Sequence, residues 1–412
     1  MGPEISLIAA AVVVGLYMAW SIGANDVANS MGTSVASGAL TLKQAVVVAG
    51  VCNFIGAVFV GTHVTNTVRK GVLNVTNFTH DPTLLIYGMF AVLLGASIWV
   101  TLATYKGLPV STTHSIIGAV IGFGLIETGL GGIRWHIVGA IVLSWIVSPF
   151  GGALISYLVF QIIKKTILNA PSPVAAVKRI GPLFVGVVFT SLSLATVYKG
   201  LKNLHLDLPF SLAAFIALVV GITAGSIAYL LLKACSVRRG NEYEQVESLS
   251  KPLQILSASY EAFAHGANDV ANAIGPVAAI HAILETHRVD MQVPVPVWML
   301  AAGGFGIVIG ISTWGYRVME TIGKRITEIT PTRGFAAEFG TATTVLICSK
   351  LGMPVSTTHT SVGNVIGVGF ARGLAALNFA VIGRIIFMWI ISLPAAAGLT
   401  ILIFKLLVLL LR

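Results

Sequence analysis

The chain has 412 residues, of which 56% are hydrophobic and only 10% are charged, whereas an average soluble domain is about 25% charged. A mean hydropathy of +0.91 over the whole length places most of the chain in lipid and excludes a large soluble domain. The net charge of +10 comes from Lys and Arg in ones and twos between apolar runs, which is typical of positive-inside topology and argues against a nucleic-acid-binding stripe.

Apolar segments alternate with short polar connections, and at about 20 residues per span there is room for roughly ten to twelve membrane helices. In chain order the segments are 5–37, 44–66, 84–105, 109–127, 136–163, 181–198, 210–233, 253–281, 296–315, 335–349, 353–371 and 379–409. We therefore predict an all-α polytopic membrane protein. The Pro, Gly, Ser and Thr residues of segment 109–127 also allow a re-entrant hairpin that enters and leaves by one face.

Basic residues between the segments predict the orientation. The connections 163–180 and 233–251 are rich in Lys and Arg and are separated by two apolar helices, so both are expected on one side. The positive-inside rule places that side in the cytoplasm. The polar stretch 236–251 is interpreted as a solvated linker near the middle of the chain.

Two motifs each occur twice. The sequence GANDVAN at 23–29 returns unchanged at 266–272, and PVSTTH at 109–114 returns at 354–359. The nearly constant offset indicates two homologous halves, an architecture common among secondary transporters. The repeat does not decide between parallel and inverted halves; a simple helix count gives parallel halves unless one short segment is re-entrant.

The repeats divide the chain into three parts. We predict a first transmembrane repeat at 1–180, connecting helices with a cytoplasmic linker at 181–252, and a second transmembrane repeat at 253–412.

The first motif places Asp26 and Asp269 within apolar segments, at a cost of about 2.5–3.5 kcal/mol each, which makes them functional-site candidates. Gly-Ala-Asn-Asp is poor helix material, so we expect the helix to break there. Freed carbonyls, amide oxygens and carboxylates form a hard-oxygen site suited to Na⁺. The alternative is a buried Asp satisfied by helix packing. The candidate Na⁺ ligands are Asn25, Asp26, Asn268 and Asp269, with Asn29 and Asn272 as further candidates.

The second motif reads as a helix start, since Pro favours the first turn and Ser or Thr caps free N–H groups. Two such starts facing each other would bind one tetrahedral oxyanion through hydroxyls, backbone N–H groups and the positive helix ends. Ordinary capping of two membrane helices is the alternative. The candidate anion ligands are Ser111, Thr112, Thr113, Ser356, Thr357 and Thr358.

Three more residues are weaker candidates. His114 and His359 complete the second motif and are either ligands or hydrogen-bonded structural residues. Glu338 is either a cation ligand or proton carrier within the membrane, or an interfacial helix cap.

Carboxylates beside an anion site repel the anion unless something compensates. Cations bound at the two Asp residues would neutralise the repulsion and couple the two ions. Alternatively, a carboxylate would accept a hydrogen bond from a protonated anion, which at neutral pH favours phosphate over sulfate.

The paired motifs, together with Arg333-Gly334-Phe335, closely resemble the inorganic phosphate transporter (PiT) family of sodium- or proton-coupled symporters. The resemblance implies two inverted repeats with broken helices, re-entrant helical hairpins that carry the Ser-Thr-Thr residues, and phosphate bound between the halves. It also implies that Asp26 and Asp269 bind Na⁺ and are essential. Many members have Glu where this chain has Asn53, which argues against a third acidic site in the first half.

The sequence thus predicts a symporter of the cell (plasma or inner) membrane that imports inorganic phosphate with Na⁺. A proton-coupled phosphate or sulfate permease is the alternative, and an anion channel is a weaker one. An enzyme is not expected, because no nucleophile–base pair or metal triad is present; no organic cofactor is expected either, and H⁺ is the alternative coupling ion. The expected partners are phosphate, sodium ions, the bilayer and a second copy in a homodimer, but not nucleic acid.

Overall fold

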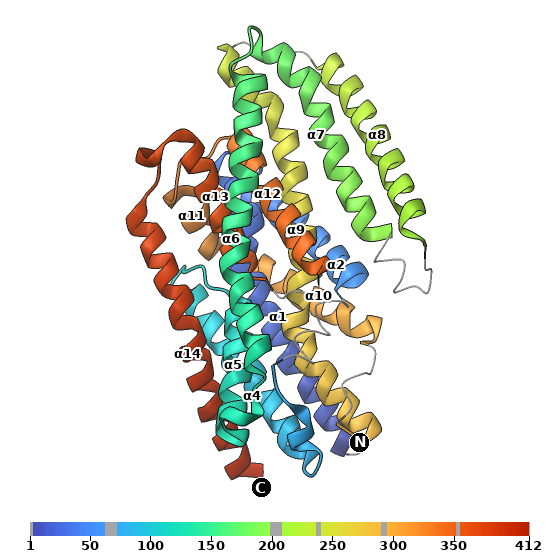
Figure 1. The fold of residues 1–412 in the computed structure, drawn as a ribbon, viewed down its shortest axis with the longest axis vertical. Helices are drawn as coiled ribbons and strands as arrows, with labels where there is room; N and C mark the ends of the chain where they lie inside the picture. Colours follow the sequence, from blue (N-terminus) through green and yellow to red (C-terminus); the bar gives the residue numbers. More distant parts are fainter. Residues whose placement is uncertain are drawn as a thin grey trace.

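The structure is a computed structural model that describes residues 3–61, 72–197, 208–235, 240–289, 295–351 and 355–411. These residues are almost entirely helical, and within them the only strand-like pairing is an isolated bridge between Leu73 and Ile133. The helices form an elongated bundle (Figure 1). The predicted all-α fold is confirmed.

The helices fall into two halves and a connector, in the order that the repeated motifs predict. The first half contains α1 (Pro3–Ala36), α2 (Leu42–Val60), η1 (Val75–Phe78), α4 (Pro82–Tyr105), α5 (Thr112–Thr128), η2 (Leu130–Gly132), α6 (Trp135–Ile163) and η3 (Lys164–Leu168). Two helices connect the halves: α7 (Pro173–Ala195) and α8 (Phe210–Ala234). The second half contains α9 (Glu242–Thr286), α10 (Val297–Trp314), α11 (Tyr316–Arg325), α12 (Pro331–Lys350), α13 (Thr357–Arg372), η6 (Leu374–Ala376) and α14 (Phe379–Leu411).

Each predicted membrane segment corresponds to a helix. Eight of the described helices are long and apolar enough to cross a bilayer: α1, α2, α4, α6, α7, α8, α10 and α14. Helices α5 and α13, with 17 and 16 residues, span about 25 Å, less than a hydrocarbon core of about 30 Å. The protein is a multi-pass membrane protein, and α5 and α13 are shorter than the hydrocarbon core.

Equivalent helices of the two halves run in opposite directions. In Figure 1, α1 rises from the end of the molecule that holds both termini, whereas α9 descends from the opposite end. Helices α6 and α14 are likewise opposed, and the α4–α5 hairpin fills the lower half of the view while α12–α13 lie in the upper half. This arrangement favours inverted over parallel halves.

The halves interlock by exchanging helix contacts. Helix α1 packs on α10 and α2 packs on α9, while α5 packs on α14 and α6 packs on α13. Glycines allow the close approach: Gly118 of α5 faces the backbone of Leu393, and the equivalent Gly363 of α13 faces the backbone of Pro149. The interior between the hairpins is therefore built jointly by both halves.

The expected helix break at Gly-Ala-Asn-Asp is wrong. Helices α1 and α9 continue through this sequence as unbroken helices of 34 and 45 residues. Gly23 and Gly266 lie where a neighbouring backbone passes, the carbonyls of Ile307 and Asn53 respectively. The following Asn and Asp side chains bond to other elements, so they do not compete for their own helix backbone.

The interpretation of 236–251 as a solvated linker is also wrong for its second part. Helix α9 begins at Glu242, where the Asn241 side chain accepts a hydrogen bond from the Glu244 N–H at 2.8 Å. The Glu247 carboxylate accepts from the N–H and hydroxyl of Thr332, at 2.9 and 2.8 Å, at the start of α12. An acid there is stabilised by the helix end, so Glu247 is buried against the bundle, whereas residues 241–244 are helical or capping but exposed. Residues 236–239 lie outside the described residues.

Candidate functional site

Helices α1 and α9 bring the two duplicated acids together in the middle of the bundle. Asp26 and Asp269 are 1% and 0% exposed, and the His265 side chain lies between them. Its Nε2 is 3.5 Å from Asp26 Oδ2 and 3.4 Å from Asp269 Oδ2. Sequence reasoning missed His265, although it precedes Asp269 by one helical turn and therefore shares its face.

The other nitrogen of His265 fixes its protonation pattern. Nδ1 lies 2.5 Å from Asn53 Oδ1, and Asn53 Nδ2 donates to the Ala49 carbonyl at 2.8 Å. This network assigns Nδ1 as the proton donor. Nε2 is then available to carry a second proton, which would make the ring an imidazolium, or to offer a lone pair to a cation. Either would place a positive charge between the two carboxylates.

The two carboxylates supply the oxygen ligands that a small hard cation prefers, and His265 adds a nitrogen. Ligand atoms of Asp26, His265 and Asp269 all lie within 4.8 Å of one another. Two buried oxygens nearby, Asn29 Oδ1 and Asp269 Oδ2, have no hydrogen-bond donor among the described residues. Such an oxygen costs about 1–3 kcal/mol, and contact with a cation would remove that cost.

The two Ser-Thr-Thr segments begin helices, as predicted. Ser111 caps α5 by accepting the His114 N–H at 3.1 Å, and Ser356 caps α13 by accepting the His359 N–H, also at 3.1 Å. The first N–H groups of each helix have no acceptor within the helix. Both helix starts therefore present backbone donors and a positive dipole end beside the acid pair.

The threonines join the two halves at the acids. Thr112 Oγ1 donates to Asp26 Oδ2 at 2.8 Å, in the same half. Thr113 Oγ1 lies 3.4 Å from Asp269 Oδ1, and Thr358 Oγ1 lies 3.4 Å from Asp26 Oδ1, each across the halves.

Backbone carbonyls complete this reciprocal pattern. Thr113 Oγ1 lies 3.2 Å from the Val355 carbonyl, and Thr358 Oγ1 lies 3.1 Å from the Val110 carbonyl. Exchanged contacts of this kind are the mark of a two-fold relation, seen here within one chain. Pro354 lies outside the described residues.

The predicted Asn residues hold the hairpin tips in place. The bonds they donate are Asn25 to the Leu108 carbonyl (3.1 Å), Asn268 to the Val355 carbonyl (3.1 Å), Asn29 to Thr358 Oγ1 (3.1 Å) and Asn272 to Thr113 Oγ1 (3.2 Å). The structure thus gathers every predicted Asn, Asp, Ser and Thr candidate in one buried region.

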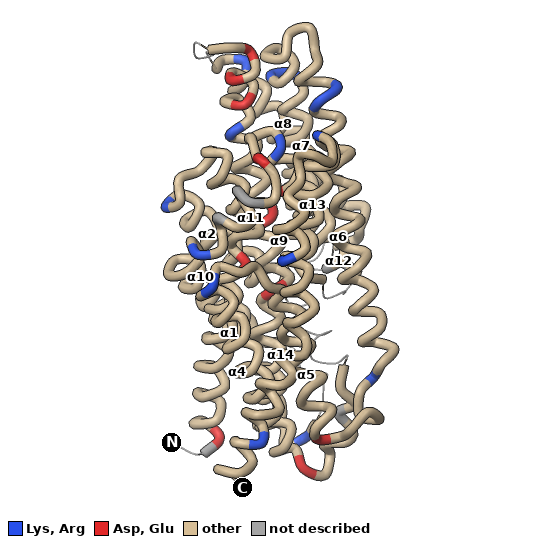
Figure 2. Tube along the Cα trace, turned by 90° about the vertical axis from the view of Figure 1, so that its left-hand side faces the viewer, with Lys and Arg blue, Asp and Glu red and all other residues tan. Residues whose placement is uncertain are grey.

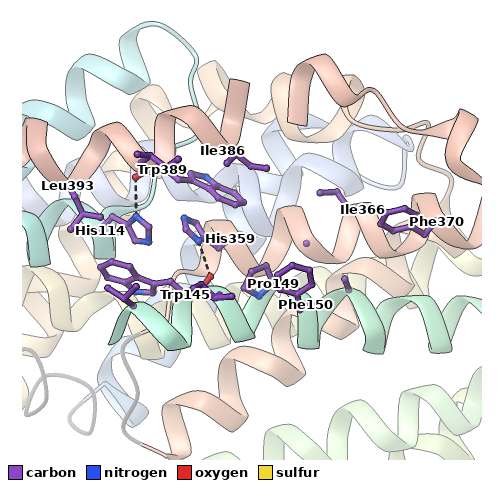
Figure 3. Close-up of a pocket in the computed structure, with 15 residues that line it drawn as sticks. His114, Trp145, Pro149, Phe150, His359, Ile366, Phe370, Ile386, Trp389 and Leu393 are labelled. Atoms are coloured by element: carbon purple, nitrogen blue, oxygen red, sulfur yellow. Dashed lines mark hydrogen bonds between the residues drawn. The ribbon is translucent and has the colours of Figure 1, made fainter. Parts of the chain in front are cut away.

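The side chains of His114 and His359 are directed elsewhere. Their Nδ1 atoms bond to the carbonyls of Trp389 and Trp145, at 3.2 and 3.3 Å. Figure 3 shows both rings beside those tryptophans, in an apolar cavity of about 460 Å³. The two imidazole rings lie 4.2 Å apart by their centroids. The structure does not bring them to the acid pair.

Glu338 forms a separate polar cluster. It is 1% exposed and lies well inside α12, so it is not an interfacial cap. Its oxygens accept from Thr33 (2.6 Å), Ser34 (2.7 Å), Ser257 (2.6 Å) and Gln254 (3.3 Å). Thr33 follows Asp26 by about two turns of α1, which places this cluster about 10 Å along the helix.

Comparisons with known proteins agree on one family. The family model described as "Phosphate transporter family" matches residues 22–400. A Pyrococcus abyssi protein named provisionally as a phosphate permease is 46% identical over 401 residues, covering 96% of each chain. A chloroplastic protein of Arabidopsis thaliana, named inorganic phosphate transporter 2-1, is 44% identical, covering 95% of this chain and 70% of the relative.

A solved structure of similar fold covers almost the whole chain. It is named as the sodium-dependent phosphate transporter, and it has a TM-score of 0.93 and 40% sequence identity, covering 98% of this chain and 99% of its own. Both the sequence match and the fold match extend over nearly the full length, and they include both copies of each repeated motif. The chain belongs to the phosphate transporter family.

Proposed function

We propose that this phosphate transporter is a secondary active symporter that imports inorganic phosphate together with Na⁺. Phosphate transport follows from the family, and the named sodium dependence of the solved relative supports Na⁺ as the coupling ion. The observation that carries the coupling is the pair of buried carboxylates, Asp26 and Asp269, beside the starts of α5 and α13.

Electrostatics connects the two ions. Two carboxylates in a low-dielectric interior repel each other and repel an anion. Each Na⁺ bound at Asp26 and Asp269 would cancel one of these negative charges, so phosphate would bind well only when the cations are bound. Phosphate binding would then depend on the sodium gradient, since no Lys or Arg is buried among the described residues.

The hairpin starts supply the anion ligands. The hydroxyls of Ser111 and Ser356 accept the capping N–H groups and still have a proton to donate. The backbone N–H groups of Thr112, Thr113, Thr357 and Thr358 would complete a cup for a tetrahedral oxyanion. Their hydroxyls would join it by turning their protons from the protein acceptors to the anion. A phosphate that carries a proton at neutral pH donates it to a carboxylate oxygen, which sulfate does not do.

The test is uptake of radiolabelled phosphate by proteoliposomes under separate Na⁺, K⁺ and H⁺ gradients. We expect uptake above equilibrium only with inward Na⁺. Uptake that ignores Na⁺ and follows the proton gradient would support the proton-coupled alternative, while equal competition by sulfate would rule out protonated-anion recognition.

Removal of either duplicated charge tests the site. We expect Asp26→Asn and Asp269→Asn each to lower Na⁺-driven uptake at least about tenfold, since a hydrogen bond or ion contact to a buried charge is worth about 1.5–3 kcal/mol. Glu127→Gln, at the exposed end of α5, is the control and should transport normally. Normal uptake by both Asn variants would overturn the site assignment.

A further inference from the structure

Helices α7 and α8 form a pair at the side of the bundle, outside the repeated halves. Figure 1 shows the pair standing beside α9, and α7 makes the contact with α9. On α8 the buried residues are Ala213, Ala217 and Gly221, which all face α7. Helix α8 therefore packs along a narrow seam on α7, and most of its remaining surface is open to lipid.

A groove of about 590 Å³ runs along this seam. Its floor consists of small residues, including Gly186, Gly221 and Gly225, where the two backbones approach closely. Its walls are aliphatic, with Leu183 and Leu218 on opposite helices. The volume lies in the range of small-molecule sites, about 300–1,000 Å³, and the smooth glycine floor suits a flexible hydrocarbon chain.

One end of the groove is basic. Arg179 lines it, six residues into α7 and thus about 9 Å from the helix start. Among the described residues Arg179 is exposed and forms no ion pair, whereas its neighbour Lys178 donates to the Cys235 carbonyl at 2.7 Å. The hydroxyls of Ser226 and Tyr229 line the groove near the same end.

This end of the molecule carries other positive charges. Lys233 lies in the last turn of α8, and Lys164 and Lys165 follow α6. Figure 2 shows Lys and Arg concentrated toward this end, with the acids of α9 nearby. Basic pockets between membrane helices on the cytoplasmic side bind anionic lipid head groups.

We propose that the α7–α8 groove binds one anionic phospholipid. The guanidinium of Arg179 pairs with the lipid phosphate, for which its planar set of donors is well suited, and one acyl chain lies along the glycine floor. A soluble phosphate does not fit this arrangement, since the groove is apolar beyond its mouth. The site is independent of the transport site between the hairpins.

Native mass spectrometry of the purified, detergent-solubilised protein tests the proposal. The protein is equilibrated with equal amounts of phosphatidylglycerol and phosphatidylcholine of the same acyl chains, and retained lipids are counted. We expect one phosphatidylglycerol to be retained in preference. Arg179→Gln should weaken its retention about fivefold, because one basic contact contributes about 1 kcal/mol, and Arg179→Lys should recover part of it.

Ser226→Phe, which fills the groove, should also weaken retention. Two matched variants should not: Ile227→Phe places the same ring on a residue of α8 that does not line the groove, and Arg384→Gln removes an exposed charge from α14. Equal retention of both lipids by the wild type, or wild-type retention by Arg179→Gln, would overturn the proposal. Displacement by free glycerol phosphate at equal concentration would do so too, because it would indicate a head-group site without a chain groove.

Discussion

Thr113 and Thr358 each connect the two halves at the level of a single hydroxyl. Each hydroxyl approaches an Asp carboxylate and a backbone carbonyl, both belonging to the opposite half. A hydroxyl has one proton, so it serves only one of these acceptors at a time. Each hydroxyl therefore leaves one of its two acceptors without that proton.

We expect Thr113→Val to lower the kcat/KM of phosphate uptake about tenfold or more while the protein stays folded. Valine keeps the shape but removes a hydrogen bond to a charged group, worth about 1.5–3 kcal/mol. Thr223→Val on α8, whose hydroxyl bonds to the Val219 carbonyl of its own helix, is the matched control. Unchanged uptake by Thr113→Val would remove this hydroxyl from the transport site.

Sequence reasoning found the two duplicated acids of the site and missed the unduplicated histidine between them. Asp26 and Asp269 were identifiable because a charge within an apolar helix is costly and because each is repeated. His265 has no counterpart in the first half, where Ile22 holds the equivalent position. Its role depends on Asn53 from another helix, which spacing along one segment does not reveal.

At the scale of elements, close backbone contacts fix how α1 sits on α10. A Cβ on Gly23 would lie 2.0 Å from the Ile307 carbonyl oxygen, and one on Gly310 would lie 2.0 Å from the Trp20 carbonyl oxygen. These two close backbone contacts fix the position of the Gly-Ala-Asn-Asp segment of α1 along the axis of α10.

We expect Gly23→Ala to lower stability by about 1–3 kcal/mol or more, since backbone must move to admit the methyl group. The measurement is the thermal unfolding midpoint of the purified protein. Gly139→Ala on α6, where a Cβ meets nothing within 4 Å, should be neutral or stabilising because Ala favours the helix. A melting temperature unchanged by Gly23→Ala would contradict the tight α1–α10 contact.

The positions of the membrane helices were predictable because hydrophobic runs mark them. Local helix propensity, in contrast, gave a wrong prediction of where a helix breaks. The 10-residue α11 was missed because it is short and polar. The break expected at Gly-Ala-Asn-Asp did not occur because tertiary contacts satisfy those side chains. Polar residues of 242–251 looked solvated, but one of them caps α12 from a distance in sequence.

For the whole molecule, the sequence did not decide whether the halves are parallel or inverted, because that depends on whether each hairpin crosses the membrane or returns to the same side. In Figure 1 the α4–α5 hairpin starts and ends at one end of the bundle. The first half then contributes three full passes, α1, α2 and α6, and the connecting pair adds two. Because the total number of passes before α9 is odd, the second half starts at the end of the bundle opposite to the N-terminus. The boundaries 1–180, 181–252 and 253–412, and the homodimer, stay predictions.

Labelling of single cysteines tests this topology. In a variant without Cys52, Cys235 and Cys348, we expect Ser172→Cys, in the α6–α7 connection, to react with an impermeant maleimide only from the cytoplasmic side. Thr79→Cys, next to η1 at the other end of the bundle, should react only from outside; both positions are exposed. Reaction of both cysteines from the same side would contradict the arrangement.

Thr113 and Thr358 each contact residues of the opposite half, and this constrains how the two-half protein could have evolved. Neither half completes the site, so a chain of one half would build it only by pairing with an upside-down copy of itself. That pairing requires one polypeptide to insert in both orientations, which a strong bias of Lys and Arg toward one end prevents. Fusion of two copies through a two-helix connector removes that conflict. Each half of the fused gene is then free to acquire its own charge bias, and the two sides of the binding site are free to diverge.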